Sequence, residues 1–264
     1  VYREQLAAFP KTTPENFFRS LLEEALKRSE VISEVRALMG LYRIGIELDS
    51  REPFDKDLLT RLTPLSLLYV ADYSRDKKID FAVSVWNDVL ERYPSSDAAI
   101  VAYMRLADVS VDLGDRVKAL EYLGKIVELF PGSPKAPGVI LQQGELLTEL
   151  GRAQEARQKY QYILRVAEWR GIIHARALYQ IGESYMEERE YAKAHGFFER
   201  TFLGYSHFAE WCAKAYLKDA QALLGMGEPA GAASTLEEAV ELLSDSAPPE
   251  LMNQIVEKLR ELKS

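Results

Sequence analysis

Apolar residues recur along most of the chain at the three- and four-residue spacing of amphipathic helices, and small residues mark a longer period. Alanine stands at five positions that are 37 or 38 residues apart, namely Ala82, Ala119, Ala156, Ala194 and Ala232. Each lies in a segment whose apolar spacing predicts a helix, and each of these helices follows another one. The pattern therefore predicts repeated helix pairs that bury their apolar faces against one another.

Residues 100–131 show one such pair in full. The first predicted helix ends at Gly114, because glycine suits the left-handed backbone of a helix terminus. The second ends at Pro131, because proline cannot continue the helical hydrogen-bond ladder. The small residues Ala107 and Ala119 lie where the two backbones cross, so we expect a close approach there.

Residues 177–185 and the helix that follows them resemble the tetratricopeptide repeat. In that family a bulky residue, a Leu-Gly pair and a Tyr lie on the first helix, with an Ala and an aromatic residue on the second. The residues that match in order are Leu178, Ile181, Gly182, Tyr185, Ala194 and Phe198. The resemblance implies an all-α, right-handed superhelix of about five to six helix pairs with a C-terminal capping helix.

We expect three parts along the chain. Residues 1–58 hold N-terminal helices, a degenerate repeat and an insertion, because Ala25 and Ala37 keep the twelve-residue spacing of the repeats but Ala82 comes 45 residues later. Residues 59–245 form the repeat array. Residues 246–264 form a capping helix, which starts after two prolines and has apolar residues on one face.

Composition excludes several kinds of activity. The 264 residues include 41 acidic and 33 basic ones, and the net charge of -8 opposes binding to nucleic acid. No apolar run approaches the roughly 18 residues that would suggest a membrane span. The three histidines fall in different predicted helices or turns, and no phosphate loop or nucleophile motif occurs. We expect no metal, no cofactor and no enzymatic activity.

In the tetratricopeptide family the first helices line a concave surface, so the resemblance implies that partners bind there. One predicted stripe on this surface is apolar and comprises Leu67, Met104, Leu141, Tyr179 and Leu217. The other is acidic and comprises Asp108, Asp112, Glu145, Glu149, Glu183 and Glu187. Basic residues flank it, namely Arg105, Arg176, Lys214 and Lys218.

Two interpretations of these stripes stay open. In the first, they form a groove that binds a peptide or protein segment, with apolar anchors and with carboxylates that select basic side chains. In the second, the charges form a solvated face and the apolar stripe packs between neighbouring first helices. A second candidate site lies at one edge, where two turns carry aromatic residues; Trp169, Arg170 and Phe208 either anchor a partner there or seal a repeat junction.

The linkers Tyr-Pro-Ser-Ser at residues 93–96 and Phe-Pro-Gly-Ser-Pro at residues 130–134 resemble those of tetratricopeptide proteins in bacterial cell envelopes. Such proteins accompany the Tol-Pal system or outer-membrane assembly. This resemblance implies a periplasmic or envelope complex, and a cytoplasmic adaptor is the alternative.

A rival function from another class is a ligand-sensing or carbohydrate-binding helical domain, or a non-catalytic module of a larger protein. That function needs a pocket in which Tyr179, Tyr185 and Trp211 converge. The sequence does not fix the partner or the oligomeric state.

Overall fold

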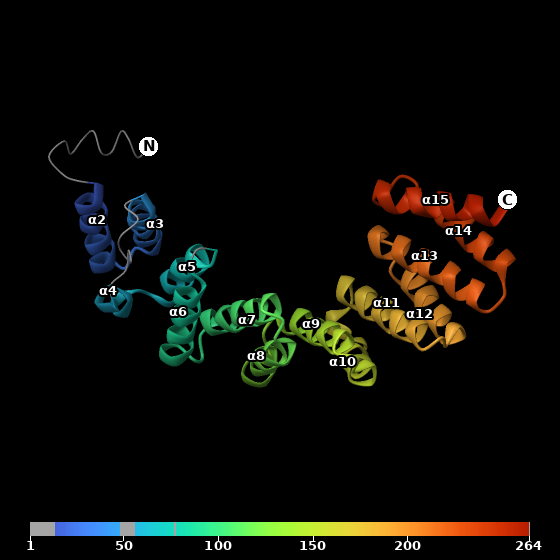
Figure 1. The fold of residues 1–264 in the computed structure, drawn as a ribbon, viewed down its shortest axis with the longest axis horizontal. Coiled ribbons are helices and arrows are strands. Elements are labelled where there is room, and N and C mark those ends of the chain that lie inside the picture. Colours follow the sequence, from blue (N-terminus) through green and yellow to red (C-terminus); the bar gives the residue numbers. More distant parts are fainter. Residues whose placement is uncertain (1–13, 48–55, 77, 264) are drawn as a thin grey trace. The chain divides into compact units, whose positions relative to one another are not determined.

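The computed structural model describes residues 14–47, 56–76 and 78–263 (Figure 1). These residues form fourteen α-helices and one 3-10 helix, with no strand among them. The predicted all-α class and the succession of helix pairs are confirmed. Contacts divide the chain into two compact units, residues 1–122 and 123–264. Residues 1–13 and 48–55, part of the predicted N-terminal region, lie outside the described residues.

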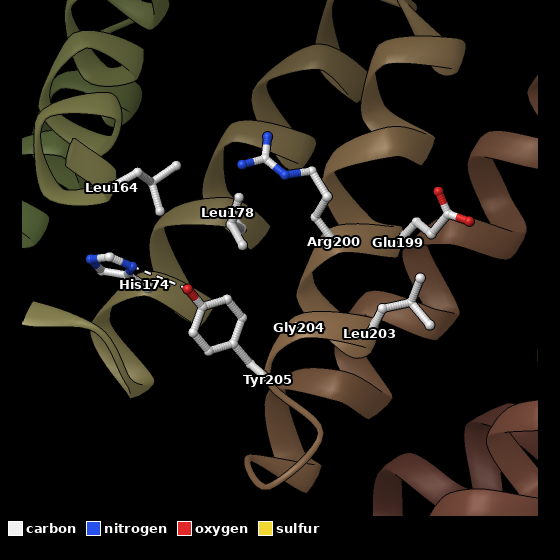
Figure 2. A pocket seen from close by; sticks show the side chains of 8 residues that line it. All are labelled: Leu164, His174, Leu178, Glu199, Arg200, Leu203, Gly204 and Tyr205. Atoms are coloured by element: carbon white, nitrogen blue, oxygen red, sulfur yellow. Dashed lines mark hydrogen bonds between the residues drawn. The ribbon is translucent and has the colours of Figure 1, made fainter. Parts of the chain in front are cut away.

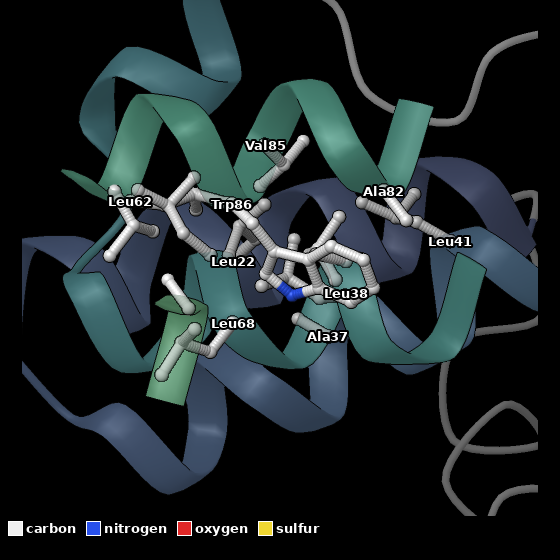
Figure 3. Packing of buried hydrophobic residues seen from close by; sticks show 14 of the residues in the cluster. Leu22, Ala37, Leu38, Leu41, Leu62, Leu68, Ala82, Val85 and Trp86 are labelled. Atoms are coloured by element: carbon white, nitrogen blue, oxygen red, sulfur yellow. The ribbon is translucent and has the colours of Figure 1, made fainter. Parts of the chain in front are cut away.

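The first unit contains helices α2 (Pro14–Arg28), α3 (Val31–Glu47), α4 (Lys56–Arg61), α5 (Pro64–Ser74), α6 (Ile79–Arg92) and α7 (Asp97–Asp112). Helix α8 (Arg116–Leu129) crosses the boundary between the units. Helix α3 packs on α2 and α5, and α6 packs on α5 and α7. Trp86 is fully buried and lies with Leu22, Leu38 and Leu62 in the core of this unit (Figure 3).

The second unit contains α9 (Ala136–Glu149), α10 (Ala153–Arg165), η1 (Ala167–Trp169), α11 (Ile172–Glu187), α12 (Tyr191–Gly204), α13 (Ala209–Gly225), α14 (Pro229–Leu243) and α15 (Pro249–Lys263). From α9 to α15 each α-helix packs against the next, and α11 also contacts α9 and α13. The first helices of successive pairs therefore lie side by side. Helix α15 packs on α13 and α14 and buries Met252 and Ile255.

The small residues of the repeat lie at the helix crossings, as the sequence predicts. All five repeat alanines are completely buried; these are Ala82, Ala119, Ala156, Ala194 and Ala232. On the first helix of its pair, Gly182 faces the ring of Phe198, and a Cβ at Gly182 would lie only 2.6 Å from that ring. Gly182 stands where the family has the glycine of its Leu-Gly pair, and it makes room for the aromatic residue of the second helix.

The turns within the pairs repeat one backbone geometry. Gly114 has a φ of 80°, and the N–H of Asp115 donates to the carbonyl of Ser110 at 2.8 Å, as in a Schellman motif. The predicted helix end at Gly114 is confirmed. In the turn between α11 and α12 the residue in this position is Arg189, with a φ of 59°. A non-glycine residue is strained there, so this turn is held by the packing around it.

Candidate partner-binding site

The predicted partner-binding residues fall in both units. Met104, Asp108 and Asp112 lie on α7 in the first unit, where the first two are half-buried and Asp112 is exposed. Leu67 lies on α5 of the same unit. The remaining residues of the two stripes lie on α9, α11 and α13 of the second unit, and we call the surface of these three helices that carries them the first-helix surface. This surface is the part of the predicted site that the structure describes as one piece.

The apolar stripe is only partly accessible. Leu141 is 1% exposed, so it lies beneath the surface, contrary to its predicted role as an anchor. Leu67 on α5 is likewise fully buried. Both side chains pack inward because neighbouring first helices are in contact, as in the second of the two interpretations. Tyr179 and Leu217 are half-buried and remain within reach of a partner.

The predicted carboxylates on α9 and α11 form ion pairs with the chain's own bases. Glu145 on α9 pairs with Arg176 on α11 at 2.8 Å. Glu183 on α11 pairs with Lys218 on α13 at 3.0 Å. Each pair links the first helix of one repeat to the first helix of the next, and half-buried pairs of this kind are worth up to about 1 kcal/mol. Part of the acidic stripe therefore holds the repeats in register.

The first unit repeats this arrangement. Asp72 on α5 accepts hydrogen bonds from Nε and Nη2 of Arg105 on α7, at distances of 2.9 to 3.1 Å. Arg105 also lies 3.8 Å from Asp108, and Asp112 pairs with Arg75. The acids of α7 are thus partly neutralised as well.

On the second unit, Glu149 and Glu187 are the exposed acids of the stripe. They lie in the last turns of α9 and α11, whereas Glu145 and Glu183 are half-buried.

An aromatic pair lies between the two ion pairs. The rings of Tyr179 on α11 and Trp211 on α13 meet edge to face, with centroids 5.5 Å apart. Two cations stack on Trp211: the guanidinium of Arg176 lies 5.4 Å from the ring centroid and Nζ of Lys214 lies 4.3 Å from it. Burial raises the pKa of Tyr179, and the nearby carboxylate of Glu183 raises it further, so this phenol stays protonated.

From the sequence, Tyr179 and Trp211 are expected to meet only in the rival ligand-binding function, together with Tyr185. Tyr179 and Trp211 are 32 residues apart and belong to successive first helices, which is the only sequence signal for their contact. Tyr185 does not join them, because its ring stacks on Phe197 and Arg157 lies over it. The three aromatic residues of the rival ligand-binding function therefore do not converge.

The aromatic residues of the predicted edge site pack in two separate places. Trp169 ends η1 and packs edge-on against Tyr162 of α10, with centroids 5.7 Å apart. Phe208 precedes α13, and its ring approaches Gly171. Trp169 and Phe208 are half-buried and Arg170 is exposed. Trp169 thus packs on its own repeat while it keeps part of its surface in solvent.

His195 on α12 has a partner that the sequence did not reveal. Its Nδ1 lies 2.6 Å from Oδ1 of Asp219 on α13, and Asp219 is completely buried. The second carboxylate oxygen, Oδ2, has no hydrogen-bond partner within the described residues. Burial raises the pKa of Asp219 to about 6, which outweighs the lowering effect of the hydrogen bond with His195.

Because the pKa of Asp219 is raised in the folded chain, we expect the free energy of unfolding to depend on pH. The unfolded chain releases the Asp219 proton near pH 4, whereas the folded chain holds it to about pH 6. The free energy of unfolding should therefore fall as pH rises through this interval, by up to about 3 kcal/mol for a shift of two pKa units. Relative to the native chain, Asp219→Asn should become more stable over the same interval, as measured by urea unfolding at several pH values.

A matched control for this experiment is Asp245→Asn, which removes an exposed carboxylate after α14. The stability gained over this pH interval, relative to the native chain, should be larger for Asp219→Asn than for this variant. A difference for Asp219→Asn that stays constant with pH would show that the buried carboxyl group has an ordinary pKa.

Known proteins share this fold at low sequence identity. Residues 101–133 match the family model described as a tetratricopeptide repeat. No curated protein matches the chain. The structure is similar to the C-terminal part of a TPR repeat-containing protein from Cytophaga hutchinsonii, with a TM-score of 0.62 and 12% identity, over 97% of this chain and 91% of that one.

Two further solved structures are similar. One is PilW, described as a widely conserved type IV pilus biogenesis factor, with a TM-score of 0.52 and 14% identity, over 76% of this chain and 90% of that one. The other is YrrB, described as a TPR protein with an unusual peptide-binding site, with a TM-score of 0.50 and 16% identity, over 74% of this chain and 92% of that one. The chain thus carries a tetratricopeptide repeat and has the fold of tetratricopeptide repeat proteins.

Proposed function

We propose that this protein is a non-catalytic interaction scaffold that binds a peptide or protein segment along the first-helix surface of α9, α11 and α13. The observation that carries this proposal is the aromatic pair of Tyr179 and Trp211, which lies half-buried between two inter-repeat ion pairs. Aromatic residues with cations stacked on them are frequent anchors of protein interfaces. The description of YrrB shows that a peptide-binding site occurs on this fold.

Rigid display is the mechanism that the ion pairs support. Because Glu145 binds Arg176 and Glu183 binds Lys218, the side chains around Trp211 are already ordered before a partner arrives. A partner therefore orders few side chains on binding, which preserves affinity. Tyr179, Trp211 and Leu217 supply apolar contact area. A basic group of the partner meets the exposed Glu187 at the end of α11.

We place this scaffold in a bacterial envelope complex. The linkers at residues 93–96 and 130–134 support that setting, and so does the fold shared with a pilus biogenesis factor. A cytoplasmic adaptor is the alternative. Among the described residues, no helix is long and apolar enough to span a membrane. Fractionation of the native host, followed by immunoblotting of the periplasmic and cytoplasmic fractions, distinguishes the two settings.

The partner site is tested with peptides that are selected by display against the native protein. We expect Trp211→Ala to weaken their binding by about 2 kcal/mol, a roughly 30-fold loss, because it removes the central anchor. Glu187→Lys should weaken binding of basic peptides by reversing an exposed charge. Isothermal titration calorimetry measures both effects.

Glu241→Lys is the matched control for charge, because Glu241 is exposed on the second helix α14. It should leave the affinity unchanged. Circular dichroism verifies that each variant keeps its helical content. Peptides that bind Trp211→Ala and Glu187→Lys as tightly as the native protein would rule out the first-helix surface as the site.

A further inference from the structure

An open pocket of about 400 Å³ lies where α10, α11 and α12 meet (Figure 2). We call it the junction pocket. Three leucines give it apolar walls: Leu164 from α10, Leu178 from α11 and Leu203 from α12. Leu203 is 65% exposed, so this wall of the pocket is accessible to a partner. The volume lies in the range of known ligand sites.

The rear of the junction pocket is rigid and its polar atoms are satisfied. Nε2 of the buried His174 lies 3.1 Å from the carbonyl of Val166, and a carbonyl can only accept, so Nε2 carries the proton. Nδ1 forms a hydrogen bond with the hydroxyl of Tyr205, also at 3.1 Å. This hydroxyl closes one side of the pocket and is already paired with His174.

Arg200 is the charged group available to an occupant. Its side chain is exposed and extends from α12 toward α11, whereas Glu199 extends to the other side (Figure 2). The guanidinium carbon lies 5.2 Å from the ring centroid of Phe197, which positions it. No ion pair of Arg200 occurs within the described residues.

The next repeat shows why a pocket exists at this junction. The residues 38 positions after Leu164 and Leu178 are Phe202 and Tyr216. Their rings stack with centroids 3.9 Å apart, and both are buried. Two aromatic rings thus fill the corresponding space between α12, α13 and α14. The two leucines are too small to do so, and they leave the junction pocket open.

The charge of the junction pocket is also particular to this repeat. The residues 38 positions after Arg200 and Leu203 are Glu238 and Glu241. The corresponding place one repeat later is therefore filled and carries two acids. The junction pocket is open and is lined by Arg200 and Glu199, of which Arg200 extends toward α11 and Glu199 to the other side (Figure 2). Both differences favour an occupant that combines an aliphatic group with a negative charge.

We propose that the junction pocket binds an acidic segment of a partner protein. One aliphatic side chain of that segment inserts between Leu164 and Leu203, and a neighbouring carboxylate pairs with Arg200. This site lies on the second helices α10 and α12 together with the start of α11, so it is separate from the first-helix surface. It takes a partner of opposite charge to the one that Glu187 would bind.

Two capped tripeptides test the proposal: acetyl-Asp-Leu-Asp-amide and the neutral acetyl-Asn-Leu-Asn-amide. On titration to millimolar concentrations, the acidic peptide should shift the methyl resonances of Leu164, Leu178 and Leu203 in a saturable way. Arg200→Gln should lower the affinity for the acidic peptide about fivefold, to that for the neutral peptide, because it removes an exposed ion pair. Arg165→Gln, which changes an exposed arginine next to Leu164, should leave the affinity for the acidic peptide unchanged.

A second variant transplants the residues of the next repeat. Leu164→Phe combined with Leu178→Tyr should fill the junction pocket with the stacked pair that the protein already accommodates one repeat later, and should abolish binding of both peptides. Binding of the acidic peptide that survives this change, or that ignores Arg200→Gln, would overturn the proposal. So would the absence of saturable shifts at the three leucines. Neither result bears on Trp211, so the two sites are tested independently.

Discussion

Replacing Phe198 with alanine should lower the free energy of unfolding by about 3–5 kcal/mol, one of the two largest effects that we expect of a single substitution. Phe198 is completely buried, and its ring lies against the backbone at Gly182 and 5.7 Å from the ring of Tyr179. The loss combines the transfer of the ring to water with the cavity left between α11 and α12, which rigid helix backbones cannot close. Urea unfolding followed by circular dichroism measures it.

Leu203→Ala is the control for this substitution, because Leu203 lies on the same helix but is largely exposed. Its effect should stay within about 0.5 kcal/mol. If Phe198→Ala lowered the free energy of unfolding no more than Leu203→Ala, the ring would not hold α11 and α12 together. The packing of Phe198 against Gly182 would then contribute nothing to stability.

Trp86→Ala should cost a similar amount, about 3–5 kcal/mol, in the first unit. The indole is completely buried among α2, α3, α5 and α6 (Figure 3). Its Nε1–H donates to Oδ1 of Asp72 at 3.2 Å, and the same carboxylate accepts from Arg105. Alanine therefore removes the largest core side chain and one partner of a shared carboxylate. Thermal and urea unfolding followed by circular dichroism measure the loss.

Two further variants separate these contributions. Trp86→Phe keeps most of the apolar volume and should cost less than Trp86→Ala, since it removes the hydrogen bond and part of the ring. Leu65→Ala changes an exposed side chain on α5 and should have an effect within about 0.5 kcal/mol. Equal losses for Trp86→Ala and Leu65→Ala would contradict the burial of the indole.

The repeat frame could be predicted from the sequence because it depends on residue size and backbone conformation. Only small residues fit where two helices cross, so Ala119 and Gly182 indicate the crossings. Gly114 indicates a turn with left-handed backbone, because glycine adopts that conformation readily. The same spacing identified α2 and α3 as a pair through Ala25 and Ala37, although the rest of the N-terminal region departs from the pattern.

The candidate site was less predictable because it depends on side chains from different repeats. The spacing between Glu145 and Arg176 is 31 residues and that between Glu183 and Lys218 is 35. Because the spacing is not constant, the repeat period does not predict these ion pairs. Long flexible side chains reach their partners from several positions. The sequence also did not predict the burial of Leu141, because the apolar pattern of one helix does not show which of its residues contact the neighbouring first helix. The partner of His195 depends likewise on a residue from the next helix pair.

The inter-repeat ion pairs run in both directions along the chain. In Asp72–Arg105, Glu145–Arg176 and Glu183–Lys218 the acid belongs to the earlier helix hairpin. In Arg75–Asp112 and Arg157–Glu188 the base belongs to the earlier hairpin. The hairpin α11–α12 therefore presents both a cation, Arg176, and an anion, Glu188, to the hairpin before it. Deleting this hairpin would leave Glu145 and Arg157 without these partners, so the number of hairpins in the array is tied to charges of both signs at their edges.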